Sequence, residues 1–405
     1  MAIAFAVRLG YILVAHTYVF KLHDDNFGFG YEMGRIGRSL ALGQGFGNPF
    51  NGITGPTAWE PPLYPLLIAG VFKLFGIYTH ASAFVLLTIN SFFAALTCIP
   101  IFCIARKSFG EDVAVWSAWL WALFPPIIFW STRWVWETSI SAFLLAMIFF
   151  VTLSLEERDE KRPWLGFGLL WGIAALTNAS LLSFLPVSGL WAWYRRSRAG
   201  KRSTGGIALS AVIFLVCISP WVARNQRTFG KFIPTRSNFG EELRLGNGPG
   251  ADGKWMDSEH PSKDAEQLRL YQQLGEIAFV AARKREALAF IRADWSRFAW
   301  LCAKRFAYFW SGPPHPRTTF SSLLGNLLYL ATSVLAMFGL AVAWRKRRPG
   351  AGLFFWLVLI FPLVYYIAFV LARYRHPIEP ELLILIVYAV AELASGGWRS
   401  APSHG

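Results

Sequence analysis

Carboxylate and guanidinium side chains gather in a few polar segments between the hydrophobic runs of this 405-residue sequence. The first of these segments, residues 21–65, places Asp24, Asp25 and Glu32 soon after the first hydrophobic run. An acidic side chain is unfavourable near hydrocarbon, by roughly 2.5–3.5 kcal/mol at the centre of a bilayer. We therefore expect that at least one of the three carboxylates is kept for a function.

Three later segments carry groups that could act together with such a carboxylate. Arg133 and Glu137 lie four residues apart in STRWVWETS. Arg224 lies in SPWVARNQRTFG, and Arg373 and Arg375 lie in ARYRHPIEP. Guanidinium groups bind phosphate oxygens through paired hydrogen bonds and stabilise charge on a leaving phosphate. A positioned carboxylate can take the proton of an attacking hydroxyl, worth about 10²–10⁴-fold in rate. This combination favours transfer of a sugar from a lipid phosphate, with inversion at the anomeric carbon.

Each carboxylate of the first segment also has a structural interpretation. Asp24 and Asp25 can simply end the first hydrophobic run in water. Glu32 can pair with Arg35 on the surface of a helix, because residues three apart are neighbours there.

The later charged groups have structural interpretations as well. Glu137 and Arg133 can form an ion pair on one helix face. Arg373 and Arg375 can anchor the chain at lipid headgroups. The functional hypothesis therefore depends on all of these segments meeting on one side of a membrane.

The composition is that of a chain that crosses a membrane several times. Hydrophobic residues make up 55% and charged residues 16%, and the mean hydropathy is +0.40. A soluble domain has about 25% charged residues. The net charge of +15 fits cationic loops held against anionic lipid, and we expect no nucleic-acid partner.

Ten hydrophobic segments approach the roughly 20 residues that a transmembrane helix needs. They are residues 2–20, 81–105, 112–129, 137–155, 164–178, 180–194, 206–222, 322–343, 352–371 and 378–395. The short connections on one side, RKSFGED, EERDEKRP, YRRSRAGKR and WRKRRPG, carry fourteen Lys and Arg. By the positive-inside rule this side is cytoplasmic, so the candidate site segments lie on the outer side.

The sequence predicts an all-α integral membrane protein in three parts. Residues 1–223 form an N-terminal transmembrane module, whose first outer loop, 21–80, holds interfacial helices over 31–42 and 61–76. Residues 224–320 form a small outer cap, Gly-rich and turn-like at first and helical over 262–309. Residues 321–405 form the C-terminal transmembrane helices.

Five stretches, in this order, resemble the GT-C glycosyltransferases, which use polyprenyl-phosphate-linked sugars. They are YEMGRIGRSLALGQGFGNPF, WEPPLYPLLIAGVFKLFG, RWVWETSISAFLL, SPWVARNQRTFGKFIP and ARYRHPIEPELL. The resemblance includes bacterial protein mannosyltransferases, aminoarabinose transferases and the RgtA/B/C/D-like group. It covers residues 1–155, 219–250 and 365–385.

This resemblance implies a catalytic carboxylate in the first outer loop. The family usually has an Asp followed by a Glu near a Tyr, whereas here Asp24 and Asp25 lie early and Glu32 follows Tyr31. Glu32 is preferred as the base because a helix would fix its position, with Asp25 second and Asp24 third. The residues expected to bind substrate are Glu60, Tyr64, Arg133, Glu137, Arg224, Arg373 and Arg375. Some relatives use a divalent cation and others none, so a metal requirement stays open.

The resulting hypothesis is a glycosyltransferase of the bacterial inner membrane with its site facing the periplasm. It would move a sugar from a polyprenyl-phosphate donor to a glycan, lipid or protein acceptor. The alternative is a flippase or transporter of lipid-linked sugars. A transporter usually places ionisable groups or broken helices near the bilayer midplane. Here the few polar candidates there are Asn90, Thr177 and Asn178, and the charges gather at one outer rim, so the enzyme is favoured.

Overall fold

The regular elements of the computed structural model are helices throughout the described residues, 1–20, 27–157, 160–314 and 319–396. Asp24 and Asp25 therefore lie outside the described part of the chain. The helices of the N-terminal part are α1 (Ala2–Val14), α2 (Glu32–Ala41), α3 (Leu63–Phe75), α4 (His80–Leu96), α5 (Cys98–Phe109), α6 (Glu111–Leu123), α7 (Pro125–Arg133), α8 (Thr138–Ser154), α9 (Arg162–Thr177), α10 (Leu185–Arg198) and α11 (Thr204–Phe229). The later helices are α12 (Phe239–Gly246), α13 (Ala265–Leu274), α14 (Glu276–Ala293), α15 (Trp295–Ser311), α16 (Phe320–Arg345), α17 (Ala351–Ile360), α18 (Leu363–Ile367) and α19 (Glu379–Ala394).

The all-helical class is confirmed, and each of the ten hydrophobic segments overlaps helix, although α1 ends at Val14 within the segment predicted over residues 2–20. Ten crossings are not confirmed. Among the described residues, three helices are long and apolar enough to cross a membrane: His80–Phe109, which joins α4 and α5, Thr204–Phe229 and Ser322–Arg345. A fourth results if α6 and α7, bent by 47°, form one span. Others, such as α1 and α8, are apolar but shorter.

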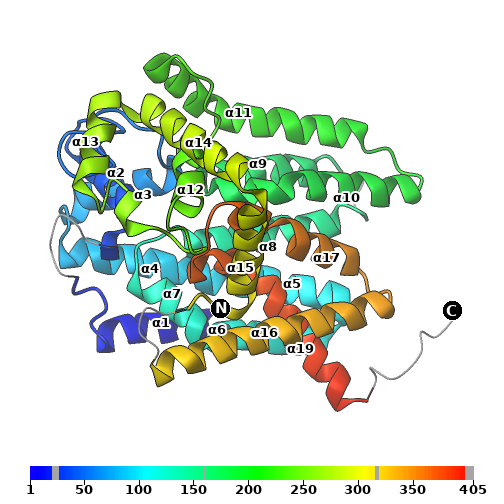
Figure 1. The fold of residues 1–405 in the computed structure, drawn as a ribbon. Coiled ribbons are helices and arrows are strands. Elements are labelled where there is room, and N and C mark those ends of the chain that lie inside the picture. The colour runs from blue at the N-terminus through cyan, green and yellow to red at the C-terminus, as the bar shows by residue number, and fades with distance from the viewer. Residues whose placement is uncertain (21–26, 158–159, 315–318, 397–405) are drawn as a thin grey trace.

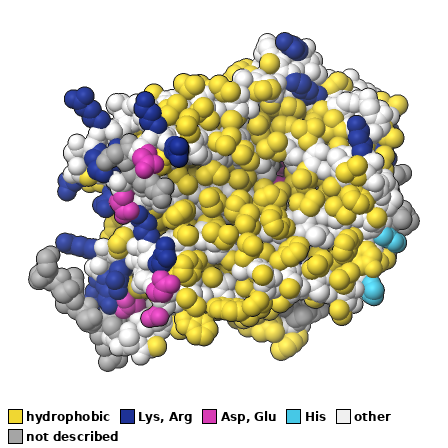
Figure 2. All heavy atoms as spheres, turned by 180° about the vertical axis from the view of Figure 1, so that it is seen from behind, with side chains coloured by type: hydrophobic (Ala, Val, Ile, Leu, Met, Phe, Trp, Pro, Cys, Tyr) yellow, Lys and Arg dark blue, Asp and Glu magenta, His cyan; other side chains and the backbone are white. Residues whose placement is uncertain are grey.

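The surface separates hydrophobic from charged side chains. Figure 2 shows hydrophobic side chains over the middle of one face, with most of the visible Lys, Arg, Asp and Glu at one edge. Ion pairs hold charged helix connections together: Lys107 Nζ lies 2.7 Å from Glu157, and Arg195 Nε lies 2.9 Å from Glu156. The connections after α5, α8 and α10 therefore meet at the same end, as their shared basic character predicted.

The segment between α11 and α16 packs on the other end of the helix assembly. Figure 1 shows α12, α13 and α14 grouped with α2 and α3. Helix α12 lies where the Gly-rich sequence predicted turns, so that prediction was wrong for residues 239–246. The helix forms because Leu243 packs against Ala287 and Ile291 of α14. Helix α11 continues to Phe229, past the boundary predicted at residue 223.

Helix α2 agrees closely with the helix predicted over residues 31–42, but its polar residues are not on a free face. Arg35 and Ser39 are 3% and 1% exposed. Arg35 Nη2 donates to Asn51 Oδ1 at 2.8 Å, and Ser39 Oγ donates to the carbonyl of Gly45. Helix α2 is therefore enclosed by its own loop and by α3. Glu32, at its first position, lies outside these contacts.

Candidate functional site

Close contact between two distant loops brings Glu32 and Glu137 to the same place. The Val135 amide donates to the carbonyl of Gly28 at 2.8 Å. Gly30 has φ +80°, and a Cβ there would lie 2.4 Å from the Val135 carbonyl oxygen, so only glycine fits without movement. Glu32 is the first residue of α2, and Glu137 immediately precedes α8. The sharp turn at Gly30 thus holds the start of α2 against the segment that leads into α8.

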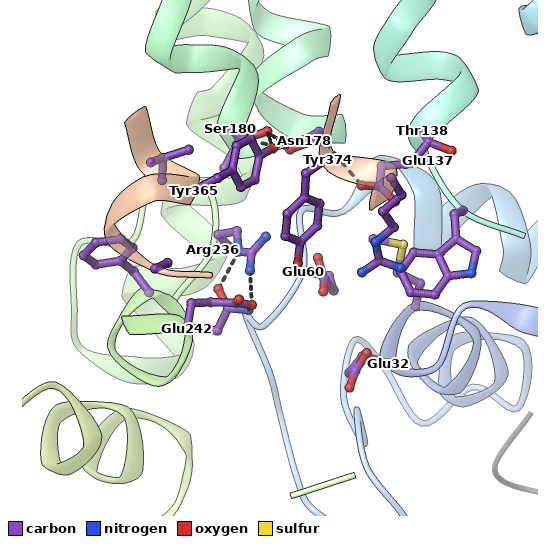
Figure 3. Close-up of a pocket in the computed structure, with 18 of the residues that line it drawn as sticks. Glu32, Glu60, Glu137, Thr138, Asn178, Ser180, Arg236, Glu242, Tyr365 and Tyr374 are labelled. Atoms are coloured by element: carbon purple, nitrogen blue, oxygen red, sulfur yellow. Dashed lines mark hydrogen bonds and ion pairs between the residues drawn. The ribbon is translucent and has the colours of Figure 1, made fainter. Parts of the chain in front are cut away.

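A cavity of about 300 Å³, called here the central cavity, lies between these carboxylates and the cap. Figure 3 shows Glu32, Glu60 and Glu137 around it, with Arg236 on the cap side. Its other polar lining residues are Thr138, Asn178, Ser180, Thr235, Asn238, Glu242, Tyr365, Arg373 and Tyr374. Four carboxylates and two guanidinium groups therefore share one small volume.

Burial makes the carboxyl groups of this cavity weaker acids. It raises the pKa of Glu60, which is 9% exposed, to about 8, although Arg236 opposes this. Burial also raises the pKa of Glu32, opposed by Arg35 and Arg373. Near pH 7 Glu60 is thus mostly protonated and can donate a hydrogen bond.

A neutral histidine lies close to Glu32. The Nε2 atom of His260 is 3.8 Å from Glu32 Oε1, and burial lowers the pKa of His260 to about 3. Its Nδ1 atom lies 2.7 Å from Ser262 Oγ. Because His260 stays uncharged near neutral pH, it leaves Glu32 as the titrating partner of this pair.

The two arginines of the cavity are held in different ways. Arg236 Nη2 donates to Glu242 at 2.6 Å, and its Nε donates to Asn238. Burial would lower the pKa of Arg236, but Glu60 and Glu242 hold it above its usual value. The Cζ atom of Arg373 lies over the Trp136 ring, 3.0 Å from its centre. Arg373 is thus held by the Trp136 ring and by a hydrogen bond with Tyr374, and it lines the cavity between them.

A chain of hydrogen bonds that begins at Glu137 forms another wall of the central cavity. Asn178 Nδ2 donates to Glu137 Oε1 at 3.2 Å, and Asn178 Oδ1 accepts from the amide and hydroxyl of Ser180. Tyr365 donates to Ser180 Oγ at 2.8 Å and stacks on Tyr374 with ring centres 4.6 Å apart. Asn178, which binds Glu137, is therefore itself held in place by Ser180, and Ser180 by Tyr365.

A second cavity of about 450 Å³ shares the wall formed by Glu32, Glu60 and Arg373. We call it the tryptophan cavity, because five tryptophans line it: Trp59, Trp130, Trp134, Trp136 and Trp255. Aromatic faces suit the apolar faces of sugar rings, and the shared carboxylates suit their hydroxyls. Glu32, Glu60 and Arg373 thus lie between the polar central cavity and the aromatic tryptophan cavity.

The structure brings four of the predicted residues together, namely Glu32, Glu60, Glu137 and Arg373. Three predicted arginines, Arg133, Arg224 and Arg375, do not line this cavity. Arg375 is buried against Glu379, with Nε 2.5 Å from Oε1, and its other nitrogens donate to Ser333 and Thr332. It faces away from Arg373, although both lie in one short 3₁₀ helix, Ala372–Ile378.

The other predicted binding residues also contact protein groups away from the central cavity. Arg224 donates to the carbonyls of Phe46 and Thr57 at 2.7 and 2.6 Å. Arg133 donates to Tyr11 Oη at 2.8 Å. Tyr64 donates to Asn90 Oδ1 at 3.0 Å, and Asn90 in turn donates to the carbonyl of Trp134. These three side chains support the loops around the site.

The lining residues that sequence reasoning missed include Arg236, Glu242, Tyr365 and Tyr374. Arg236 and Glu242 lie six residues apart in TRSNFGEEL, and this pair of opposite charges was the available signal. The two tyrosines stood inside or next to an apolar run, where the sequence gives no reason to separate a lining ring from a packed one.

The donor set of the described residues does not fit a metal centre. No group of three or more His, Cys, Asp or Glu side chains in that part of the chain could hold an ion. The carboxylates of the central cavity face arginines and amides instead.

Comparisons with known proteins match part of the chain to one protein family and relate its fold to solved structures. The sequence profile described as dolichyl-phosphate-mannose-protein mannosyltransferase matches residues 59–223. No curated protein matches the chain. The oligosaccharyltransferase of Archaeoglobus fulgidus, in a complex with Zn and sulfate, is similar in structure, with a TM-score of 0.52 at 14% identity over 90% of this chain and 45% of that one.

A second structure from Archaeoglobus fulgidus, AglB in complex with an inhibitory peptide and a dolichol-phosphate, gives a TM-score of 0.51 at 14% identity over 94% of this chain and 49% of that one. ArnT from Cupriavidus metallidurans aligns over 98% of this chain and 79% of its own at 14% identity, but its TM-score of 0.39 is too low to bear on the fold. The chain spans about half the length of the oligosaccharyltransferase that it matches. The predicted likeness to GT-C membrane glycosyltransferases is therefore confirmed, by the family match and by the fold.

Proposed function

We propose that this chain is a multi-pass membrane glycosyltransferase that moves a hexosyl or pentosyl group from a polyprenyl-phosphate donor to an acceptor hydroxyl. The acceptor would be a glycan, lipid or protein outside the cytoplasm. The observation that carries the proposal is the shared wall of the two cavities. There an acidic side chain, Glu32, and a stacked arginine, Arg373, lie within reach of both chambers.

Each group has a defined task in the proposed reaction. Arg373 would bind the donor phosphate and offset the charge that it gains as the bond to the sugar breaks. Glu32 in its ionised form would take the proton of the acceptor hydroxyl as that oxygen attacks the anomeric carbon. The raised pKa of Glu32 favours this role, because a carboxylate of higher pKa is a stronger base. One displacement inverts the anomeric centre.

The remaining carboxyl groups would bind hydroxyls. Glu60, protonated near pH 7, can donate a hydrogen bond, whereas Glu137, held by Asn178, can accept one. With Glu242 paired to Arg236, these groups line one side of the central cavity. This distribution of donors and acceptors suits a ring that carries several hydroxyls.

The site would face the periplasm of a bacterial inner membrane. In support, the basic connections at Lys107 and Arg195 lie at one end of α8 and α10, whereas Glu137 lies at the start of α8. At 1.5 Å per residue, the 17 residues of α8 separate the two ends by about 25 Å. The basic end would be cytoplasmic and the cavity would open on the other side.

The test is transfer by the purified protein from a panel of polyprenyl-phosphate sugars, with Glu32→Gln as the decisive variant. We expect transfer in the wild type and a loss of at least about 10²-fold in kcat for Glu32→Gln. Binding should persist, seen as donor-dependent protection from thermal unfolding.

The matched control is Glu286→Gln, which changes a half-exposed carboxylate of α14 outside both cavities. It should retain full activity. Unchanged transfer by Glu32→Gln would remove Glu32 from the chemistry. Movement of the donor across a bilayer without any glycosylated product would instead indicate a flippase.

A further inference from the structure

Glu276 is a buried cap carboxylate that binds two of the segments that form the central cavity. It begins α14 and is 4% exposed. Its Oε1 accepts from the Ala58 amide at 2.7 Å and from Ser237 Oγ at 2.6 Å. Its Oε2 accepts from Tyr271 Oη at 2.9 Å and from Thr57 Oγ1. One side chain thus joins the first loop, the segment after α11 and α13.

The two loop segments are also bonded to each other and to α11. The Ser237 amide donates to the carbonyl of Ala58 at 2.8 Å, which closes a ring of hydrogen bonds with Glu276. Arg224 of α11 donates to the carbonyl of Thr57, so Thr57 is held at both its hydroxyl and its carbonyl. This arrangement fixes the relative position of two loops that the chain leaves far apart.

Each of the two loops carries a charged residue of the central cavity next to this ring of hydrogen bonds. Glu60 follows Ala58 by two residues, and Arg236 immediately precedes Ser237. We infer that Glu276 is a positioning residue of the proposed glycosyltransferase: it sets the separation of Glu60 and Arg236 through the Ala58–Ser237 ring. This inference rests on the proposed function only for its effect on the rate.

The four hydrogen-bond donors around Glu276 predict which substitution at this position disrupts the loops more. All four groups donate to Glu276, and a carboxylate, which only accepts, satisfies them together. Glu276→Ala would leave the Ala58 amide and three hydroxyls without this acceptor. Glu276→Gln keeps one oxygen for Ala58 and Ser237, and its NH₂ group can donate to Thr57 and Tyr271 after their hydroxyls turn. The Gln variant should therefore preserve most of the ring.

Hydrogen exchange of the detergent-solubilised full chain tests the positioning without any substrate. We expect Glu276→Ala to speed amide exchange at least about tenfold in peptides covering residues 46–62 and 231–240, with little change elsewhere, because the net contribution of such bonds corresponds to about that factor. Glu276→Gln should stay near the wild type. The control is Glu286→Ala in the same helix, which removes a carboxylate bonded to Arg244 and Arg283.

The rate effect is tested by combining substitutions. Displacement of a reacting or binding group by about 1 Å can lower a rate about 10²-fold. If Glu276 acts through Arg236, then Glu276→Ala in an Arg236→Ala background should lower kcat/KM by less than about threefold, although alone it lowers it at least about tenfold. A merely structural role predicts that the two losses multiply.

The outcomes separate this inference from the proposed function. Unchanged exchange in both peptides for Glu276→Ala, or multiplying rate losses, would overturn the positioning role. Absence of transfer in the wild type would overturn the proposed function, while the exchange result would still decide whether Glu276 fixes the loops. If Glu276→Ala does not fold, Thr57→Val removes a single donor and should give a smaller change in the same two peptides.

Discussion

Glu60 allows the electrostatics of the central cavity to be tested without a substrate. Burial raises the pKa of its carboxyl from 4.5 to about 8. In the unfolded chain the carboxyl loses its proton near pH 4.5, whereas the folded protein keeps it until about pH 8. The unfolded state therefore binds fewer protons in this range, and stability falls as the pH rises from about 4.5 to about 8.

The size of this effect follows from the two pKa values. At about 1.4 kcal/mol for each pKa unit, the loss reaches about 5 kcal/mol above pH 8. With about 2.1 cal/mol/K of unfolding entropy for each of 405 residues, this corresponds to about 6 °C in Tm. Glu60→Gln has nearly the same shape but cannot ionise, so it should escape this loss.

The assay is the thermal unfolding of both proteins in one detergent between pH 5 and pH 9. The difference in Tm should be small at pH 5 and grow in favour of Glu60→Gln as the pH rises. Other raised carboxyl groups, such as Glu241, contribute equally to both proteins and cancel. The reasoning would be refuted by a difference in Tm that stays constant with pH. It would also be refuted by a wild type whose Tm rises by several degrees relative to the variant as the pH rises.

Three further outcomes are expected. Arg373→Ala should raise KM for the donor about ten- to hundredfold, since a hydrogen bond to a charged group contributes about 1.5–3 kcal/mol; an unchanged KM would place the phosphate elsewhere. Arg375→Ala should destabilise the protein by about 3–5 kcal/mol, because it leaves Glu379 buried without its cation, whereas Arg133→Ala at the surface should change stability by less than about 1 kcal/mol. Burial lowers the pKa of His260 to about 3, so on acidification below pH 6.5 the unfolded chain takes up this proton before the folded protein does, and stability falls. His260→Asn should reduce this loss of stability. Equal acid sensitivity of the wild type and the variant would contradict the prediction.

The hydrophobic helices could be predicted from the sequence because their signal is local. The segment predicted over residues 137–155 is α8, Thr138–Ser154, and the segment over 378–395 is α19. Helix α12 could not be predicted, since its eight residues include two glycines and it is stabilised by packing against α14 rather than by its own propensity. The number of crossings also depends on how helices such as α6 and α7 join, which composition does not determine.

The site was predictable in kind but not residue by residue. Glu32, Glu137 and Arg373 meet as the charge pattern indicated, whereas Arg375, of the same type and two residues away, does not. In a 3₁₀ helix of three residues per turn, such neighbours point in different directions, and only the packing partners decide which one reaches a cavity. The roles of the four residues that meet stay predictions until the variants are measured.

The common wall of the two cavities bears on the order of events in catalysis. Since the central cavity and the tryptophan cavity both border Glu32 and Arg373, the donor and the acceptor of the proposed reaction would each have a cavity of their own. Such a layout suits a ternary complex, and initial-rate plots against both substrates should then show intersecting lines rather than the parallel lines of a ping-pong scheme.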